Sequence, residues 1–501
     1  MWLINDCIIA AVMVLMIVSY VKERKALMLT TALTAYCILP VFKIYGFGLH
    51  IDLNSAYLVS LLLLILFFVE VFRKSVRIGK PVIVYAAGTL LIHVAYLIGW
   101  LSAGYPTWHS ILTFIPSFHF MCAALLIGIF LSNMDKESMR SACKWSLILV
   151  GTANILFVIL DFTAFDFAWK LTNLFYASDA EFAPLRVMLD LGYFNRGYGT
   201  FYTPVYFGSL FLLFSAALCG LMFQRKANKP YAYILVFAVV FAGLYAFTKT
   251  YILGVWTVLI ALFACVVLHL AGCAVKKRRH PERDTGTSLG HTLKQAALRF
   301  ALFALCFAIA FAGVAVSTPT KLHHQVEYYF GFMAKPFDAL TSRYGPTGET
   351  NTPDDENMEP DAQPQVPMGG VTQGAQQVFL DHPVFGVGPN NSRGEFIGDS
   401  QYISILHHGG IVAFVLYGLL FGYLAISFLV KKEYSRLGIL FALAVCCLSS
   451  LIFVSNFAIP FVGFLLCVDN DSLIGLAKLK SVTWSWGRGR TAKTGVLPEN
   501  Q

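Results

Sequence analysis

The sequence predicts an all-α, polytopic integral membrane protein. Its 501 residues are 57% hydrophobic and only 13% charged, whereas a soluble domain carries about 45–50% apolar and about 25% charged residues. The apolar residues come in blocks, many close to the roughly 20 residues that a helix needs to cross a bilayer. This composition excludes a soluble enzyme, a disordered protein and a nucleic-acid-binding protein of this length, although the net charge is +9.

Twelve apolar blocks are candidate membrane spans, and a thirteenth, 457–468, is short and contains Pro460. In chain order the twelve blocks are 4–21, 26–46, 56–72, 82–102, 111–132, 145–165, 201–223, 231–247, 252–275, 296–316, 403–430 and 437–454. No basic segment precedes the first block, so we expect no cleaved signal peptide. The fold prediction is therefore about 12–13 transmembrane helices.

The positive charges predict the orientation of these spans. Of the 37 Lys and Arg residues, 28 follow odd-numbered spans or lie in the tail that begins at Lys478. Since positive loops stay in the cytoplasm, the N-terminus is expected outside. A cytoplasmic tail then requires a thirteenth crossing, whereas a re-entrant 457–468 segment would leave the tail outside, against the rule. We predict thirteen crossings, which leaves nine Lys and Arg residues on the outer side.

The spans divide the chain into four predicted regions. Residues 1–317 hold the first ten spans and a shorter outer loop at 166–200. Residues 318–400 form one large outer loop, in which 345–367 is acidic, contains no Lys or Arg, and has the composition of a flexible linker. Residues 401–477 hold the C-terminal spans, and 478–501 are a basic tail. Loops as long as 318–400 are usually functional or disordered.

Cysteine and histidine patterns predict no metal site and no cofactor. Nearly all of the 11 Cys residues lie inside apolar blocks, where they are expected to be small core residues. No CxxC pair occurs, and His407 and His408 are adjacent, so they point in different directions on a helix and rarely bind one ion.

Four short motifs resemble, in order, those of the O-antigen ligase/polymerase superfamily. The most specific is Gly386-Val-Gly-Pro-Asn-Asn, followed by Asp399-Ser-Gln-Tyr402 and Gly409 at the start of the eleventh span. The others are Arg196-Gly-Tyr-Gly-Thr-Phe, Thr248-Lys-Thr-Tyr-Ile-Leu-Gly and Ser342-Arg343. Each motif is weak alone, but their order and the late outer loop extend the resemblance over nearly the whole chain.

This resemblance implies a fold and a chemistry. Members of the superfamily are integral membrane glycosyltransferases of the GT-C type that work outside the membrane, without a metal ion. Their donor is an oligosaccharide on undecaprenyl pyrophosphate. In polymerases the acceptor is a second lipid-linked repeat unit, and in ligases it is lipid A core. Membrane lipids and a chain-length regulator are further candidate partners.

Cations on the outer side are the first candidate site residues. The leaving group is a lipid diphosphate, and without a metal ion fixed cations must stabilise its developing charge. Arg196, Lys249, Arg343 and Arg393 fall in or near the four motifs and are predicted to bind pyrophosphate, with Arg343 also catalytic. Lys249 could instead reach an interface by snorkelling.

The acceptor hydroxyl needs a base or a hydrogen-bond acceptor. Asp399 is the leading candidate, although a residue at that point could also simply cap the helix. The ligase pattern has His at the position aligned with Asp399, so the Asp favours a polymerase. Glu395, His407 and His408 are alternative bases, and the two histidines could equally be core residues. Tyr402 could stack on a sugar ring or only pack.

The prediction is a Wzy-type polysaccharide polymerase in the bacterial inner membrane, with its active site facing the periplasm. Transfer is expected to invert the anomeric carbon. Two alternatives stay open: an O-antigen ligase, and a transporter or flippase of lipid-linked oligosaccharide. The sequence contains no internal repeat of the kind that many transporters have, which favours an enzyme.

Overall fold

The structure is a computed structural model of the whole chain. The residues that it describes are 2–39, 42–46, 49–73, 75–103, 112, 114–175, 199–201, 204–223, 230–246, 248–279, 289–317, 379–389, 400–448, 450–467 and 473–475.

Among the described residues, nine helices are long and apolar enough to cross a membrane. They are α1 (Trp2–Val21), α3 (Ser55–Phe72), α4 (Lys80–Ser102), α6 (Phe114–Ser132), α7 (Lys136–Thr163), α10 (Pro204–Phe223), α12 (Lys249–Arg279), α13 (Leu289–Ser317) and α17 (Gln401–Lys431). Shorter helices are α2 (Lys25–Ile38), α8 (Phe165–Phe175), α11 (Pro230–Leu244), α18 (Tyr434–Cys446) and α19 (Ile459–Leu466), with 3₁₀ turns η1 (Ile452–Val454) and η2 (Asn456–Ala458). A helix lies in each predicted block, so the prediction of a polytopic helical protein is confirmed at this level.

Two short antiparallel strand pairs depart from the all-α prediction. Strand β1 (Phe42–Gly46) pairs with β2 (Leu49–Leu53), and β3 (Arg77–Gly79) pairs with β4 (Leu473–Gly475). The predicted span 26–46 therefore ends as a helix at Ile38. Leu39 is extended, with φ −74° and ψ 135°, because a residue before proline, here Pro40, is disfavoured in the helical region.

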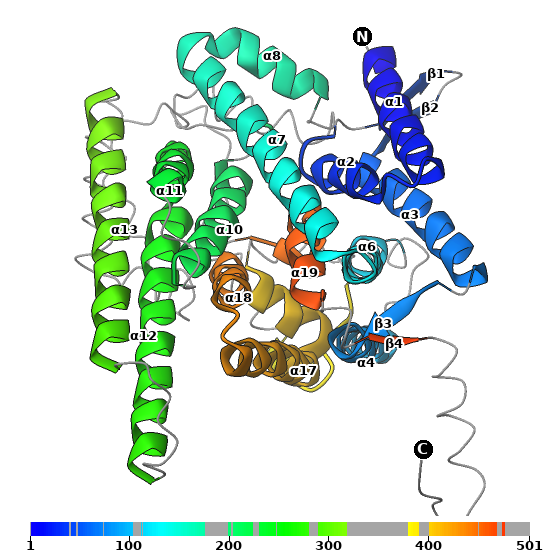
Figure 1. Cartoon of the computed structure of the whole chain (residues 1–501). Coiled ribbons are helices and arrows are strands. Elements are labelled where there is room, and N and C mark those ends of the chain that lie inside the picture. Colours follow the sequence, from blue (N-terminus) through cyan, green and yellow to red (C-terminus); the bar gives the residue numbers. More distant parts are fainter. Residues whose placement is uncertain are drawn as a thin grey trace, which may run out of the picture.

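The helices form two groups linked through α18, which packs along α10 and also contacts α17 and α19 (Figure 1). One group packs α11, α12 and α13 around α10, and α10 also packs along α18. In the other group, α4 lies against α17, α6 against α19, and α2 against both α1 and α7. Segments far apart in the sequence are therefore neighbours, and α10 and the C-terminal helices lie between the N-terminal helices and α11–α13 (Figure 1).

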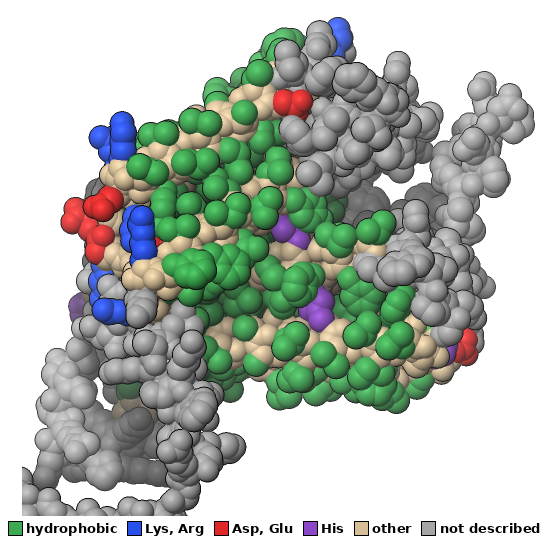
Figure 2. Space-filling model, turned by 90° about the vertical axis from the view of Figure 1, so that its right-hand side faces the viewer, with side chains coloured by type: hydrophobic (Ala, Val, Ile, Leu, Met, Phe, Trp, Pro, Cys, Tyr) green, Lys and Arg blue, Asp and Glu red, His purple; other side chains and the backbone are tan. Residues whose placement is uncertain are grey.

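The outer surface of the bundle is apolar. On the face shown in Figure 2 most described side chains are hydrophobic, and Lys, Arg, Asp and Glu lie toward its margins. On α3, for example, Leu61 is 54% and Ile65 52% exposed. Soluble monomers rarely expose continuous apolar surface of this extent, so this surface suits lipid.

Side-chain caps satisfy several helix ends between spans. The Asn54 side chain accepts a hydrogen bond from Ala56 N at the start of α3, and Asp135 accepts one from Ser138 N at the start of α7. At the C-terminal end of α10, the Arg299 guanidinium of α13 donates a hydrogen bond to Phe223 O at 3.2 Å. These bonds matter because unpaired amides and carbonyls at a buried helix end are costly.

After α18 the chain runs back along this helix. At the end of the return, Cys467 Sγ lies 3.3 Å from Met139 Sδ near the start of α7. The Phe464 ring lies 5.2 Å from the Arg436 guanidinium near the start of α18, and β4 then pairs with β3 between α3 and α4. The segment 450–467 therefore covers the length of α18 in the opposite direction.

Candidate functional site

Three consecutive residues of α10 contact three separate parts of the chain. Phe207, Gly208 and Ser209, here called the α10 junction, are buried. Phe207 packs beside Gly199, Gly208 lies against Thr248, and Ser209 Oγ is 3.2 Å from Ser450 Oγ. Thr248 lies 49 residues after Gly199, and Ser450 lies 202 residues after Thr248, but successive positions on one helix bring these segments together.

The first segment is the turn at Gly199 and Thr200, which ends the Arg196 motif. Asn154 Oδ1 accepts hydrogen bonds from Thr200 N at 3.0 Å and from Thr200 Oγ1 at 3.1 Å. Asp161 Oδ2 accepts one from Gly199 N at 3.2 Å. The Phe201 ring then packs 5.4 Å from that of Phe457. Two side chains of α7 thus hold a turn that leads into α10.

The second segment is the start of α12, in the Thr248 motif. Thr248 Oγ1 accepts from Tyr251 N at 3.3 Å, as a residue capping a helix does. A side chain at Gly208 would collide with Thr248 Oγ1, so glycine at this position permits the close approach. The buried Tyr251 hydroxyl lies 3.0 Å from Ser215 Oγ on α10, which fixes the direction of α12.

The third segment links α18 to the start of α17. Cys447 O accepts hydrogen bonds from Gln401 N at 2.9 Å and Ser400 Oγ at 3.3 Å. Gln401 Oε1 accepts from Phe453 N at 3.0 Å. The N-cap position of α17 is Ser400, whose side chain makes no capping hydrogen bond, and Asp399, the other candidate for this cap, lies outside the described residues.

A break in α17 at Gly410 forms a second feature, more than two helical turns beyond Gln401. Gly410 has φ 58° and ψ −158°, which interrupts the helix. The loop 383–388 docks at the break and exchanges backbone hydrogen bonds with it. These bonds run from Val387 N to His407 O (2.9 Å), Gly388 N to His408 O (2.9 Å), Ile411 N to Pro383 O (2.9 Å) and Val412 N to Val384 O (3.2 Å).

Glycines allow this loop to dock. A Cβ on Gly410 would lie 2.6 Å from Pro383 O, and one on Gly386, with φ 63°, would lie 2.8 Å from Gly409 N. A Cβ on Gly99 of α4 would lie 3.0 Å from Gly386 O. These three positions have room for the hydrogen atom of glycine but not for a Cβ. The segment after Pro383 is therefore a loop whose amides and carbonyls replace helical partners, as broken helices in membranes require.

Three predicted site residues lie in the described part of α17. His407 is buried, and His408 Nδ1 lies 3.3 Å from Ser404 Oγ with its ring edge-on to Tyr96 at 5.6 Å. The Tyr402 hydroxyl donates to Ala444 O at 2.8 Å. These contacts are those of side chains packed between helices, and the rings of His407 and His408 also lie edge-on to each other at 5.4 Å.

The other predicted site residues are not described in full. Arg196, Arg343, Arg393, Glu395 and Asp399 lie outside the described residues, and Lys249 is described only through its backbone, as the first residue of α12. The described chain nevertheless includes Gly199, three residues after Arg196, and Ser400, directly after Asp399. The described end of the Arg196 motif is therefore anchored at the α10 junction, and the residue after Asp399 is anchored at the start of α17.

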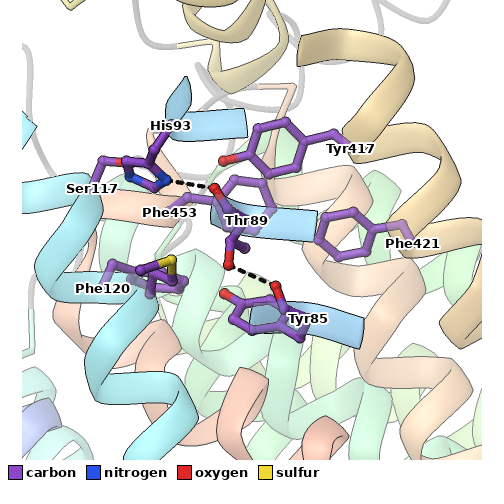
Figure 3. A pocket seen from close by; sticks show the side chains of 9 residues that line it. Tyr85, Thr89, His93, Ser117, Phe120, Tyr417, Phe421 and Phe453 are labelled. Carbon is purple, nitrogen blue, oxygen red and sulfur yellow. Dashed lines mark hydrogen bonds between the residues drawn. The ribbon is translucent and has the colours of Figure 1, made fainter. Parts of the chain in front are cut away.

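A small recess adjoins the third segment through Phe453 (Figure 3). It lies between α4, α6 and α17 and has room for little more than a water molecule. His93 Nδ1 bonds to Thr89 O at 2.8 Å, and since a carbonyl only accepts, this nitrogen carries the proton. His93 Nε2 then accepts from Ser117 Oγ at 3.2 Å. The arrangement is a hydroxyl bonded to an oriented imidazole.

Some polar residues of this region were not identified from the sequence. Asn154 and Asp161 lie in an apolar block, as do His93 and Ser117, and the span assignment absorbed them. The available signal was their position, because a polar or ionisable side chain at membrane depth is costly and usually has a specific partner. Among the described residues, no group of three or more His, Cys, Asp or Glu could hold a metal ion.

No family model, curated protein or solved structure matches this chain. The resemblance to the O-antigen ligase/polymerase superfamily therefore remains an expectation that depends on the four motifs.

Proposed function

We propose that this chain is a polysaccharide polymerase of the O-antigen type. It would transfer a glycan from undecaprenyl pyrophosphate to a hydroxyl of another lipid-linked repeat unit, at the outer face of the bacterial inner membrane. The observation that carries the proposal is the convergence at the α10 junction. The turn after Arg196 and the helix start at Lys249 contact neighbouring residues there, and Ser450 connects the junction to the start of α17 next to Asp399.

The proposed chemistry needs no cofactor. The acceptor oxygen attacks the anomeric carbon while the bond from this carbon to the diphosphate oxygen breaks, which inverts the configuration. The hydroxyl proton passes to Asp399. The electron pair leaves with the diphosphate, where Arg196, Lys249, Arg343 and Arg393 would stabilise the charge.

Thirteen crossings are part of the proposal. The return of 450–467 along α18 supports a crossing from the end where α17 begins to the end where α18 begins. The pairing of β4 with β3 supports a tail on the same side as the loop between α3 and α4, which the positive-inside rule assigns to the cytoplasm. The large loop 318–400 and the motif cations then face the periplasm.

Purified protein supplied with carrier-linked repeat units in detergent tests this function. We expect wild-type protein to make longer glycans, and Arg343→Ala and Asp399→Ala each to abolish extension. Lys321→Ala and Lys335→Ala, which remove cations of the predicted outer loop that lie outside the four motifs, are matched controls and should retain normal rates. Normal extension by both Arg343→Ala and Asp399→Ala would show that the site assignment is wrong.

The same assay separates the alternatives. A ligase would lengthen nothing from repeat units alone but would transfer glycan when lipid A core is added. A transporter would make no new glycosidic bond with either acceptor. Either result would exclude the polymerase.

A further inference from the structure

Two polar side chains are buried on one face of α7. Asn154 is 0% and Asp161 7% exposed, and Val150 and Val158 are buried on the same face. The two polar residues are seven positions apart, which is two helical turns, so both point the same way. Buried polar groups in a membrane bundle are stable only with partners.

Their described partner is the turn before α10. Asn154 binds Thr200 through both the backbone amide and the hydroxyl, and its own amide nitrogen donates to Val150 O at 2.9 Å. Asp161 accepts from Gly199 N. The turn also has φ +59° at Gly199, where a Cβ would lie 2.6 Å from Phe207 Cδ2. Three hydrogen bonds and one steric limit thus fix this turn against α7 and α10.

Fixing this turn restricts the motif in front of it. Arg196 is three residues from Gly199 in the sequence, and three residues of extended chain cover at most about 11 Å. Loss of the turn's position would release this restriction. Packing alone does not need so many directed bonds, since an apolar residue at 154 would bury the same surface without a partner.

We infer that Asn154 and Asp161 form a clamp that positions the Arg196 motif relative to the other motifs at the α10 junction. In this role they are positioning residues, and the role rests on the proposed transfer function. The clamp itself is a property of the structure, so it can be tested without any substrate.

Thiol labelling tests the clamp. The reporter substitution Phe201→Cys is introduced into protein that also carries Cys7→Ser, which removes an exposed cysteine. Protein with Cys7→Ser alone is the blank. We expect Asn154→Leu and Asp161→Leu to raise the maleimide labelling rate of Cys at 201 at least tenfold, because the turn is released. Asp161→Asn retains an acceptor for Gly199 N and should stay within about threefold of the parent. The buried Cys446 and Cys447 should remain unlabelled, which shows that the change is local.

Milder variants guard against a general folding defect. Thr200→Val removes one hydrogen bond at nearly constant volume and should raise labelling, whereas Thr200→Ser retains the hydroxyl and should not. Thr257→Val on α12 removes a hydroxyl that bonds to Leu253 O within its own helix, and it should leave labelling unchanged. Unchanged labelling in Asn154→Leu, Asp161→Leu and Thr200→Val would overturn the clamp, as would fast labelling in Asp161→Asn.

Glycan extension tests the positioning role. Because Arg196 is proposed to bind diphosphate in the substrate itself, its displacement should raise KM for carrier-linked donor about tenfold in Asn154→Leu, with recovery in Asp161→Asn relative to Asp161→Leu. A loss of folded protein lowers the rate but leaves KM unchanged. If labelling rises while KM stays constant, the positioning role is wrong. If wild-type protein extends no glycan, the proposed function fails, and labelling still decides the clamp.

Discussion

At the residue scale, single glycines determine where segments distant in sequence can meet. Gly199, Gly208 and Gly410 each leave space that a neighbouring backbone or side chain fills. The sequence marks such positions poorly, because the chain contains 39 Gly residues and several have open surroundings. Gly151 and Gly418, for example, would place a Cβ within 4 Å of nothing.

Gly199→Ala should therefore be destabilising. Its φ of +59° is unfavourable for alanine, and the new methyl group would collide with Asn154 Oδ1 and Phe207. We expect a loss of about 1–3 kcal/mol and a lower midpoint of thermal unfolding in detergent. Gly151→Ala, on α7 itself, is the matched control and should be neutral or stabilising by up to about 1 kcal/mol. Equal midpoints for the two variants would contradict the described turn.

The candidate site could be predicted only in part at this scale. Charge and motif order selected Arg196, Lys249, Arg343, Arg393 and Asp399. Asn154 and Asp161 were not selected, because a span assignment averages hydropathy over about 20 residues and two polar side chains change that average little. Their role depends on a turn some 40 residues further along the chain, which no local pattern encodes.

At the element scale, the helices were predictable because long apolar runs have few alternatives in a membrane. The errors lie at their ends. Helix α7 begins at Lys136, nine residues before the predicted block, because Asp135 caps it and its first turns are polar. Helix α2 ends before Pro40. Strand β2 (Leu49–Leu53) alternates apolar and polar residues as a strand does, but this five-residue pattern directly follows the long apolar run of the second predicted block, and β3 and β4 have only three residues each.

The break in α17 is an element-scale feature that sequence periodicity could not reveal. Its four carbonyl and amide groups are satisfied by the loop 383–388, about 25 residues away in sequence. Without this loop each group would be unpaired at a cost of several kcal/mol in an apolar environment. The loop and the break are therefore expected to form or be lost together.

Gly410→Ala tests this dependence. A methyl group there would lie 2.6 Å from Pro383 O, and φ 58° with ψ −158° is a conformation that alanine avoids. We expect destabilisation of at least about 1–3 kcal/mol and faster proteolysis within 383–388. Gly418→Ala, on the same helix with open surroundings, should retain wild-type stability and protection. Wild-type protection in Gly410→Ala would mean that the loop does not depend on the break.

At the scale of the whole molecule, the number of crossings decides the side of the tail. The segment 450–467 returns along α18, and β4 pairs with β3. Green fluorescent protein fused after Gln501 should therefore fluoresce, as should a fusion in the loop at Lys432, because this reporter folds in the cytoplasm. Alkaline phosphatase fused at either point should be inactive, and inserted in the acidic segment 345–367 it should be active. An active phosphatase at Gln501 would exclude thirteen crossings.

The α10 junction also has a consequence for how such a protein can diversify. The three residues of the α10 junction hold segments that long stretches of chain connect. The ends of a connecting stretch therefore stay in place when its length changes. Doubling the length of a flexible loop costs only about 0.6 kcal/mol of closure entropy. Insertions, deletions or exchanges between residues 318 and 378 should therefore leave the scaffold intact, and under the proposed function a change of sugar specificity would then need substitutions in this stretch alone.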